Sequence, residues 1–422
     1  MTDIRNLVLD ILAENENTGA YISDIVLSVQ EKYAFLEERD RAFIKLVSSG
    51  VVGKKIALDH VIDNLSSVKT VKMKPVILHI IRMACFEILY MDHIPARASV
   101  NEAVRLTKKR HMTGLSGFVN AVTRKIAALH ESGGIAFPND RIRYSCPEYI
   151  YGLLISGYGK EKTEGILKSL DQKKPLYLRV NSLKCSVSEL EEILKKEGID
   201  ARKAPFGNYA LAASGFNVSE SRAFKEGLYS VQDISSMAAI EAAGVKEGMT
   251  VIDICAAPGG KACYVSELMK NTGRVLAFDL SPEKTRKIEE NAERLGLKNI
   301  DISVKDASVF DEELEGLADL VIADLPCSGL GVMNRKVDIK YRITEEDIKT
   351  LTKLQRDILD NVCRYIKQGG HLLYSTCTLT GAENHDQSSY IEEKFRFRRI
   401  VQRQFVQGTD PCDGFYFAVY EK

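Results

Sequence analysis

The sequence contains no tryptophan and only 10 prolines among its 422 residues. It has no run of about 18 apolar residues, which excludes an ordinary membrane-spanning helix. The opening stretch, MTDIRNLVLDILAENEN, lacks a continuous apolar segment, so we expect no signal peptide there. With 45% hydrophobic and 27% charged residues, the composition disfavours extensive disorder, and the length allows two or three domains.

The nine cysteines form no CxxC pair and show no regular spacing. A disulfide framework or a structural zinc site would show such spacing. We therefore expect reduced thiols, no metal and a cytoplasmic protein. Cys85, Cys263 and Cys363 lie in helical patterns and are expected to be small buried core residues.

Positive and negative charges balance at 58 each, but they are unevenly distributed. Residues 1–40 hold 3 basic and 9 acidic side chains, whereas residues 41–130 hold 15 basic and 5 acidic ones. A basic segment can bind a polyanion such as nucleic acid, although such segments are more often solvated faces. On charge alone, both interpretations stay open.

Periodicity divides the chain into regions of different character. Residues 1–131 place apolar residues at three- and four-residue intervals, which predicts an all-α domain, and aperiodic residues 132–147 predict a linker. Residues 148–240 alternate two helical segments with short extended runs, which predicts a small α+β module. Residues 241–422 alternate apolar strands with amphipathic helices, which predicts an α/β domain with a doubly wound, mostly parallel sheet.

A glycine-containing turn follows the first strand of the α/β domain. In DICAAPGGKACYV, residues 253–265, a strand ends and a helix begins, which is where doubly wound folds bind nucleotide-like ligands. The turn is neither GxGxxG nor a phosphate loop ending in GK[ST]. A ligand with an adenosine and no phosphate, such as S-adenosylmethionine, therefore fits better. The predicted cofactor-binding turn consists of Cys255, Ala256, Ala257, Pro258, Gly259, Gly260 and Lys261.

Acidic residues end the next strands. Asp279 ends the second strand, where a carboxylate can accept hydrogen bonds from ribose hydroxyls, and Asp306 ends the third, where it can accept from an adenine amino group. The alternative is that each merely caps the helix that follows. A glycine turn and two acids at three consecutive strand ends favour the cofactor site.

Two further strand ends each carry a cysteine. In ADLPCSGLGV, residues 323–332, Pro326 ends the strand, so Cys327 lies on a turn beside Asp324. Cys377 follows the strand in HLLYSTCTLT. In a doubly wound sheet we expect these strands to be parallel neighbours, about 4.8 Å apart. The two thiols should then meet beside the cofactor turn, where a core role for both is hard to sustain.

The runs DICAAPGGKA, DLPCSGLG and YSTCT, with Glu383-Asn384 after the last cysteine, resemble the signature of S-adenosylmethionine-dependent RNA cytosine-C5 methyltransferases. LRVN (178–181) and VQDISS (231–236) match this signature too. Residues 1–130 resemble the NusB-type RNA-binding helical domain. The combination is similar to the bacterial 16S ribosomal RNA cytosine-C5 methyltransferases of the Sun/Fmu group, and the match covers nearly the whole chain.

This resemblance implies a class I, Rossmann-like methyltransferase domain preceded by a ferredoxin- or RRM-like RNA-binding module and a NusB-like domain. It implies that Cys377 bonds covalently to carbon 6 of cytosine and that Cys327 assists release. Asp324 would stabilise the adduct and contribute to the cofactor site, and Lys261 would line the pocket. The substrate would be RNA, with 16S ribosomal RNA favoured, and the enzyme a monomer. Departures from the family pattern at Met237, Asn334 and Val337 remove no catalytic group.

Two other functions fit parts of the sequence. One is a non-catalytic RNA-binding or antitermination factor with a degenerate enzyme behind it, but Cys327, Cys377, Asp324 and the glycine turn are all intact. The other is a methyltransferase acting on transfer RNA, DNA or protein. Protein methyltransferases need no paired thiol. The resemblance of the YSTCT run, which contains Cys377, to the RNA methyltransferase signature favours RNA over DNA. The choice between ribosomal and transfer RNA rests on resemblance alone.

Overall fold

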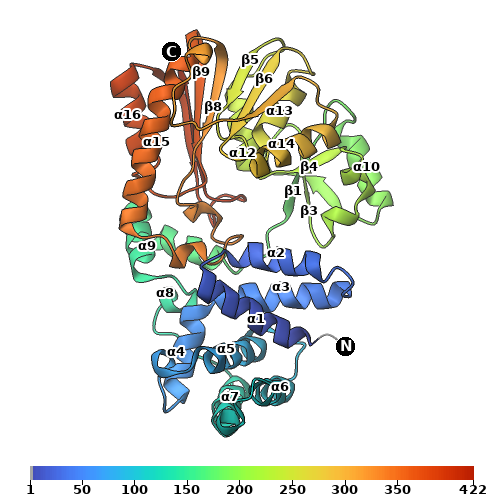
Figure 1. The fold of residues 1–422 in the computed structure, drawn as a ribbon, viewed down its shortest axis with the longest axis vertical. Coiled ribbons are helices and arrows are strands. Elements are labelled where there is room, and N and C mark those ends of the chain that lie inside the picture. Colours follow the sequence, from blue (N-terminus) through green and yellow to red (C-terminus); the bar gives the residue numbers. More distant parts are fainter. Residues whose placement is uncertain (1–2) are drawn as a thin grey trace. The chain divides into compact units, whose positions relative to one another are not determined.

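The computed structural model describes residues 3–422, which form two compact units (Figure 1). The first unit contains residues 3–171 together with Met333–Arg342, and the second contains Gln172–Val332 and Ile343–Lys422. Each unit has its own hydrophobic core. Across the described residues, no helix combines the length and the apolar character that crossing a membrane requires.

The first unit is built from α-helices, which confirms the predicted all-α fold of the N-terminal region. Helix α5 (Pro75–Tyr90) is central, and every residue from Ile77 to Ile88 is buried. Its sequence is accordingly mostly apolar, and the buried His79, Arg82 and Glu87 each bond a side chain of another helix. The other helices are α1 (Ile4–Thr18), α2 (Ile22–Lys32), α3 (Glu38–Gly53), α4 (Lys55–Leu65), α6 (Ala96–Lys109), α7 (Ser116–Glu131), α8 (Asp140–Arg143) and α9 (Glu148–Ser169).

Two features of this unit differ from the sequence pattern. The helical periodicity is continuous over residues 38–65, yet α3 ends at Gly53 and α4 begins at Lys55. Helix α9 was expected in the small α+β module but belongs to the first unit, as does Met333–Arg342, which lies inside the predicted α/β range.

The second unit begins with a small antiparallel sheet. Its strands are β1 (Leu176–Val180), β2 (Ala201–Lys203), β3 (Ala210–Ala213) and β4 (Tyr229–Val231), in the order β2-β3-β1-β4. Helices α10 (Val187–Lys196) and α11 (Arg222–Lys225) accompany it, and α10 begins with a capping box in which Ser186 and Glu189 bond each other's backbone amides. Leu178, Leu190 and Leu194 form its core, so the predicted α+β module is present.

The remainder of the second unit is an α/β sandwich around a seven-stranded sheet, ordered β10-β11-β9-β8-β5-β6-β7. The strands from β9 to β7 in this order are parallel, while β10 and β11 are antiparallel. The strands are β5 (Thr250–Asp253), β6 (Arg274–Asp279), β7 (Ile300–Val304), β8 (Ala318–Asp324), β9 (Ile366–Thr376), β10 (Arg398–Phe405) and β11 (Phe415–Glu421). This confirms the predicted doubly wound, mostly parallel sheet.

Helices cover both faces of this sheet (Figure 1). Alternate residues along each strand point to opposite faces, so Val251 packs in one core and its neighbour Ile252 in the other. Helices α12 (Ile234–Ala242) and α13 (Gly260–Leu268) contribute to the first core, and α15 (Glu345–Tyr365) and α16 (His385–Phe395) to the second. Helix α14 (Pro282–Leu295) connects β6 to β7.

Candidate active site

The predicted cofactor turn lies at the carboxyl end of β5, the central strand of the parallel part of the sheet. Residues Cys255–Lys261 connect β5 to α13, whose first residue is Gly260. Gly259 has a φ of 100°, a left-handed conformation that glycine adopts without strain, and a Cβ there would lie 3.1 Å from the Ile288 side chain. The sequence thus provides a turn that stays close to α14.

Asp279 is joined to this turn, whereas Asp306 is not. The buried carboxylate of Asp279 accepts hydrogen bonds from the amide of Ala257 at 2.9 Å and from Lys284 at 2.9 Å. Asp306 is exposed, two residues beyond the end of β7, and accepts from the amide and hydroxyl of Ser308 at 2.9 and 2.7 Å. Neither residue caps an α-helix, which excludes the capping alternative.

Lys261 and Asp324 link the cofactor turn to the strand that carries the first cysteine. Their side chains form an ion pair, and Asp324 also accepts a hydrogen bond from the Ser375 hydroxyl at 2.6 Å. Asp324 and Ser375 are paired residues on the parallel neighbours β8 and β9. The ammonium of Lys261 also lies 5.3 Å from the centroid of the Phe415 ring, so the lysine is held by two strands.

The two predicted cysteines meet, as the sheet topology predicted. The sulfur atoms of Cys327 and Cys377 are 3.3 Å apart, and both residues are partly exposed. The hydrogen bond with Cys377, burial and the nearby carboxylate of Glu383 raise the pKa of the Cys327 thiol well above its ordinary value. Cys327 therefore keeps its proton at neutral pH and can serve as a hydrogen-bond donor to its neighbour.

Glu383 is a buried carboxylate whose role the sequence analysis missed. It accepts hydrogen bonds from the Ser328 amide at 2.8 Å and the Ser328 hydroxyl at 2.5 Å, both in the turn next to Cys327. It also accepts from the Thr380 hydroxyl at 2.7 Å and from Gln355 of α15 at 3.2 Å. The position was noted only as part of a family signature, because its contacts depend on loops that are distant in the sequence.

Asn384 holds the residues on either side of Cys377 through hydrogen bonds. Its side chain accepts from the hydroxyl of Thr376 at 2.6 Å and donates to the carbonyl of Thr378 at 3.2 Å, so it holds both neighbours of Cys377. The hydroxyls of Ser328 and Thr378 are 2.6 Å apart, which joins the two cysteine turns directly. Adjacent Glu383 and Asn384 thus fix the backbone around both thiols.

Asp253 is a second functional candidate that the sequence analysis did not single out. It is the last residue of β5, only 1% exposed, and neither carboxylate oxygen has a side-chain hydrogen-bond partner within residues 3–422. Burial raises the pKa of Asp253 to about 7. A buried acid without a side-chain partner, at the end of the strand that precedes the cofactor turn, is a group that a bound donor could satisfy.

The other cysteines are not part of this arrangement. Cys85, Cys263 and Cys363 are at most 2% exposed, which confirms that they are core residues, and all nine cysteines are free thiols. Burial raises the pKa of each of these three thiols. These three thiols are therefore poor nucleophiles at neutral pH.

Comparisons with known proteins agree with this geometry. Residues 242–418 match the family model described as 16S rRNA methyltransferase RsmB/F, residues 2–128 match the NusB family, and residues 146–229 match the ferredoxin-like domain of RsmF/B-like methyltransferases. In each case a match to the sequence coincides with a fold described above.

Known proteins are similar to this chain along most of its length. The chain is 34% identical to the probable ribosomal RNA small subunit methyltransferase B of Bacillus subtilis, over 91% of this chain and 87% of that protein. Among solved structures, PH0851 has the same fold, with a TM-score of 0.82, 24% identity and coverage of 99% and 98% of the two chains.

A further structure, NSun6 from Pyrococcus horikoshii with SFG, has a TM-score of 0.60 and 24% identity, and covers 65% of this chain and 98% of its own. The family assignments and the fold make the chain an S-adenosylmethionine-dependent RNA methyltransferase. With its helical, ferredoxin-like and methyltransferase parts all matched, the chain belongs to the ribosomal RNA small subunit methyltransferase B family.

Proposed function

We propose that this enzyme methylates carbon 5 of a cytosine in 16S ribosomal RNA through a covalent adduct with Cys377. The observation that carries the proposal is the 3.3 Å separation of the Cys327 and Cys377 sulfur atoms at neighbouring strand ends. Carbon 5 of cytosine is too weak a nucleophile to accept a methyl group unaided. A thiol pair beside the cofactor turn supplies what this chemistry needs, namely a nucleophile and a second group that manages its departure.

The cofactor is proposed to bind at Cys255–Lys261, with Asp279, Asp306 and Asp324 as polar contacts. Three features fit a ligand that carries an amine and an adenosine but no phosphate. No side chain caps the amino end of α13 within residues 3–422, Asp279 is fixed beside the turn, and the oxygens of Asp253 have no side-chain partner among the described residues. When bound, S-adenosylmethionine supplies an electrophilic methyl group.

Cys377 acts first in this mechanism. Its thiolate adds to carbon 6 of the cytosine, and the ring electrons move so that carbon 5 becomes nucleophilic. Asp324 is proposed to hydrogen-bond the edge of the ring, while Lys261, already paired with Asp324, lines the pocket and orients that carboxylate. The Glu383 and Asn384 contacts hold the attacking sulfur in place while the adduct forms.

Cys327 acts during release. A water molecule, which can reach the partly exposed thiols, acts as base and takes the carbon-5 proton; the electrons of that C–H bond re-form the double bond between carbons 5 and 6 and expel Cys377 as a thiolate. The raised pKa of Cys327 keeps its S–H intact, so it can donate a hydrogen bond to the departing sulfur 3.3 Å away. The two chemically identical side chains thus take different roles: Cys377 bonds to the base, and Cys327 assists its departure.

The rest of the chain is proposed to hold the RNA. We assign residues 1–131 to an RNA-binding NusB-like domain, 132–147 to a linker, 148–240 to a small RNA-binding module and 241–422 to the methyltransferase domain. The basic excess of residues 41–130 supports binding to phosphates. The target base must leave its stack to reach the thiols, which favours an unpaired region of the RNA. A cytoplasmic monomer is proposed, in keeping with nine free cysteines.

Substitution of each cysteine tests the mechanism. Cys377→Ala should abolish both methylation and covalent capture of RNA, because no bond to carbon 6 can form. Cys327→Ala should leave a protein–RNA adduct that survives denaturation, because release is impaired. Gel electrophoresis under denaturing conditions with labelled RNA measures the adduct. Methylation by Cys377→Ala at the wild-type rate would refute the assignment.

The substrate is tested separately. Bisulfite sequencing of total RNA from a strain lacking the gene should reveal one cytosine in 16S ribosomal RNA that has lost its methyl group. Restoring the wild-type gene should restore the mark, and restoring the Cys377→Ala variant should not. Loss of a mark in transfer RNA instead would assign the same chemistry to a different RNA.

A further inference from the structure

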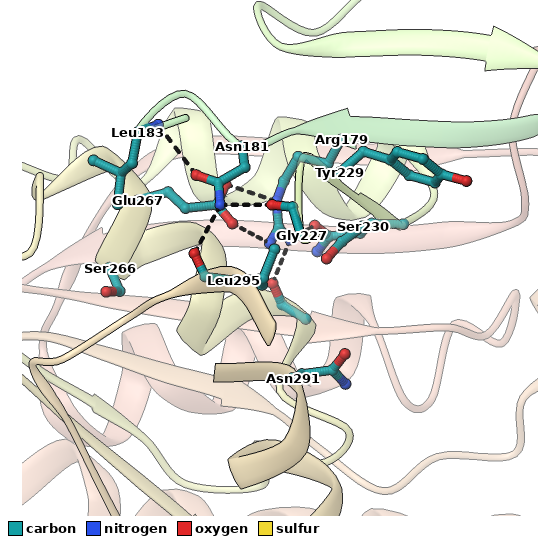
Figure 2. Close-up of polar contacts among 12 residues, drawn as sticks. Arg179, Asn181, Leu183, Gly227, Tyr229, Ser230, Ser266, Glu267, Asn291 and Leu295 are labelled. Atoms are coloured by element: carbon teal, nitrogen blue, oxygen red, sulfur yellow. Dashed lines mark hydrogen bonds and ion pairs between the residues drawn. The ribbon is translucent and has the colours of Figure 1, made fainter. Parts of the chain in front are cut away.

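Two sequence motifs, LRVN at residues 178–181 and VQDISS at 231–236, have so far no role in the proposed chemistry. The structure brings them together at the junction between the small α+β module and the methyltransferase domain, both of which lie in the second unit. Arg179 of the first motif is fully buried on β1 (Figure 2). A fully buried arginine is rare and must find partners for its five N–H donors.

One of those partners belongs to the cofactor turn, and another lies further along the helix that follows it. Nε and Nη2 of Arg179 bond the two carboxylate oxygens of Glu267, on α13, at 3.1 and 2.7 Å. Nη1 donates to the carbonyl of Gly260 at 2.7 Å and to the side chain of Gln232. Gln232 in turn donates to Ser236 at 3.1 Å, within the second motif. The guanidinium therefore fixes the last glycine of the turn to a strand of the small module.

The ion pair between Arg179 and Glu267 does not by itself explain the stability of the junction. Removing two charges from water costs free energy that their attraction only partly offsets, so apolar side chains of similar size often serve as well. The geometric result is specific: a rigid planar group joins Gly260, Gln232 and Glu267 at once, and a lysine cannot reproduce that fork. The face of Tyr264, 4.9 Å from the guanidinium carbon, closes the remaining side.

The junction also has contacts that do not reach the turn. Asn181, two residues after Arg179 in the same motif, donates to the carbonyls of Gly227 at 2.9 Å and Leu295 at 3.0 Å (Figure 2). It is also fully buried, and its side chain accepts from the amide of Leu183. Asn181 therefore joins the module to the end of α14 without contacting Cys255–Lys261 and provides a matched control.

We propose that Arg179 is a positioning residue for cofactor binding: by holding the Gly260 carbonyl, it fixes the turn that binds S-adenosylmethionine. The affinity for the cofactor then depends on a side chain of the RNA-binding module, outside the methyltransferase domain itself. This inference rests on the proposed assignment of Cys255–Lys261 as the cofactor site.

The test measures cofactor binding by isothermal titration calorimetry on the full-length protein. Arg179→Met alone would leave Glu267 buried and unpaired, so the main variant is Arg179→Met combined with Glu267→Met, which removes both charges. We expect its Kd for S-adenosylmethionine to rise roughly tenfold, as for loss of a charged hydrogen bond. The melting temperature and the KM for RNA should stay close to wild type, as should kcat at saturating cofactor.

Further variants separate the possible outcomes. Arg179→Lys keeps a charge for Glu267 but loses the fork, so it should weaken cofactor binding similarly even if the double variant folds poorly. Asn181→Ala should lower the melting temperature and leave the Kd unchanged. A Kd within about twofold of wild type in both Arg179 variants would overturn the inference.

Asp279→Asn keeps this result distinct from the proposed function. If Asp279→Asn weakens cofactor binding and the Arg179 variants do not, only the role of Arg179 is wrong. If Asp279→Asn also leaves the Kd unchanged, the assignment of the cofactor site itself is wrong.

Discussion

Glu383 shows how a single buried side chain can organise two catalytic turns. Its carboxylate accepts four hydrogen bonds, from the amide and hydroxyl of Ser328, from Thr380 and from Gln355. Glutamate is seldom fully buried, and here it serves donors from three separate segments. The contacts make the distance between the Cys327 and Cys377 backbones depend on one residue that touches neither sulfur.

Replacing Glu383 should therefore impair the adduct more than the cofactor site. Glu383→Ala leaves buried donors unpaired and lets the turns separate, so we expect the rate of adduct formation to fall on the order of a hundredfold. The Kd for S-adenosylmethionine should not change. Glu383→Gln should largely restore the rate, because the hydroxyls of Ser328 and Thr380 can reverse and accept from its amide. Single-turnover trapping of labelled RNA measures this rate.

The control for that experiment is Asp386→Asn, which removes an acid three residues away that is exposed to solvent. It should leave the rate at the wild-type value. If Glu383→Ala forms the adduct at the wild-type rate in folded protein, the positioning role is excluded.

Among single residues, the sequence predicted the pair of thiols but not the buried acids around them. Cys327 and Cys377 follow two strands that can be recognised from their apolar runs, and parallel strands place their carboxyl ends at one edge. Glu383 and Asp253 carry no comparable signal. Asp253 is important because it is buried, and Glu383 because its partners Gln355 and Ser328 lie more than 25 residues away in the sequence; periodicity reveals neither.

At the scale of elements, three loops pack against one another at the cysteine edge of the sheet. The amide of Gly331, in the turn after Cys327, donates to the carbonyl of Cys377 at 2.9 Å. Its own carbonyl accepts from the amide of Gly414, just before β11, at 2.9 Å. A Cβ at Gly331 would lie 1.9 Å from the Gly414 oxygen and 2.8 Å from the Cys377 oxygen. The close approach of these three segments thus requires glycine.

Gly331→Ala should force the loops apart, because both obstructing atoms belong to the backbone. We expect a loss of about 1–3 kcal/mol in the free energy of unfolding. We also expect slower oxidation of Cys327 and Cys377 to a disulfide by a mild oxidant, measured by mass spectrometry of peptides. Gly381→Ala, in the loop after Cys377, has open space around its Cβ and should change neither quantity. Unchanged oxidation in Gly331→Ala would show that the loops tolerate the methyl group.

The strands and helices of the sheet were predictable in kind because their periodicities are strong. The bounds of these elements were less predictable. The helical pattern is continuous over residues 38–65, so it did not indicate the break at Lys54. The amphipathic pattern persists through this break, although Gly50 and Gly53 lower the helix propensity near it. Tertiary contacts also hold the end of α3: the carbonyl of Gly53 accepts from the side chains of Lys340 and Tyr341, which arrive from a distant part of the chain.

At the scale of the whole molecule, the helical unit is completed by a segment from the methyltransferase region. Met333–Arg342 begins six residues after Cys327 and belongs to the first unit. Lys340 is buried there, with its ammonium bonded to the carbonyls of Gly53 at 2.9 Å and Tyr144 at 3.1 Å. Burial lowers the pKa of Lys340 to about 8. No feature of the N-terminal sequence could have indicated this contribution.

Asp338 in this segment supplies a cap that α2 lacks locally. Tyr21, at the N-cap position, makes no side-chain hydrogen bond to the helix, while the carboxylate of Asp338 accepts from the amide of Ile22 at 3.0 Å and from Arg342 at 2.7 Å. An acid at the start of a helix satisfies a free amide and interacts favourably with the helix dipole. The segment next to the Cys327 turn is thereby tied to the start of α2.

Asp338→Ala should consequently destabilise a helix more than 300 residues away in the sequence. We expect a loss of about 1–2 kcal/mol in the stability of the helical unit. Amide hydrogen exchange, followed by mass spectrometry, should accelerate in the first turn of α2 and in residues 333–342. Asp357→Ala, the same change at an exposed position of α15, should leave both segments protected. Unaltered exchange at α2 in Asp338→Ala would mean that the cap contributes nothing, and that the helical unit folds independently of the segment after the Cys327 turn.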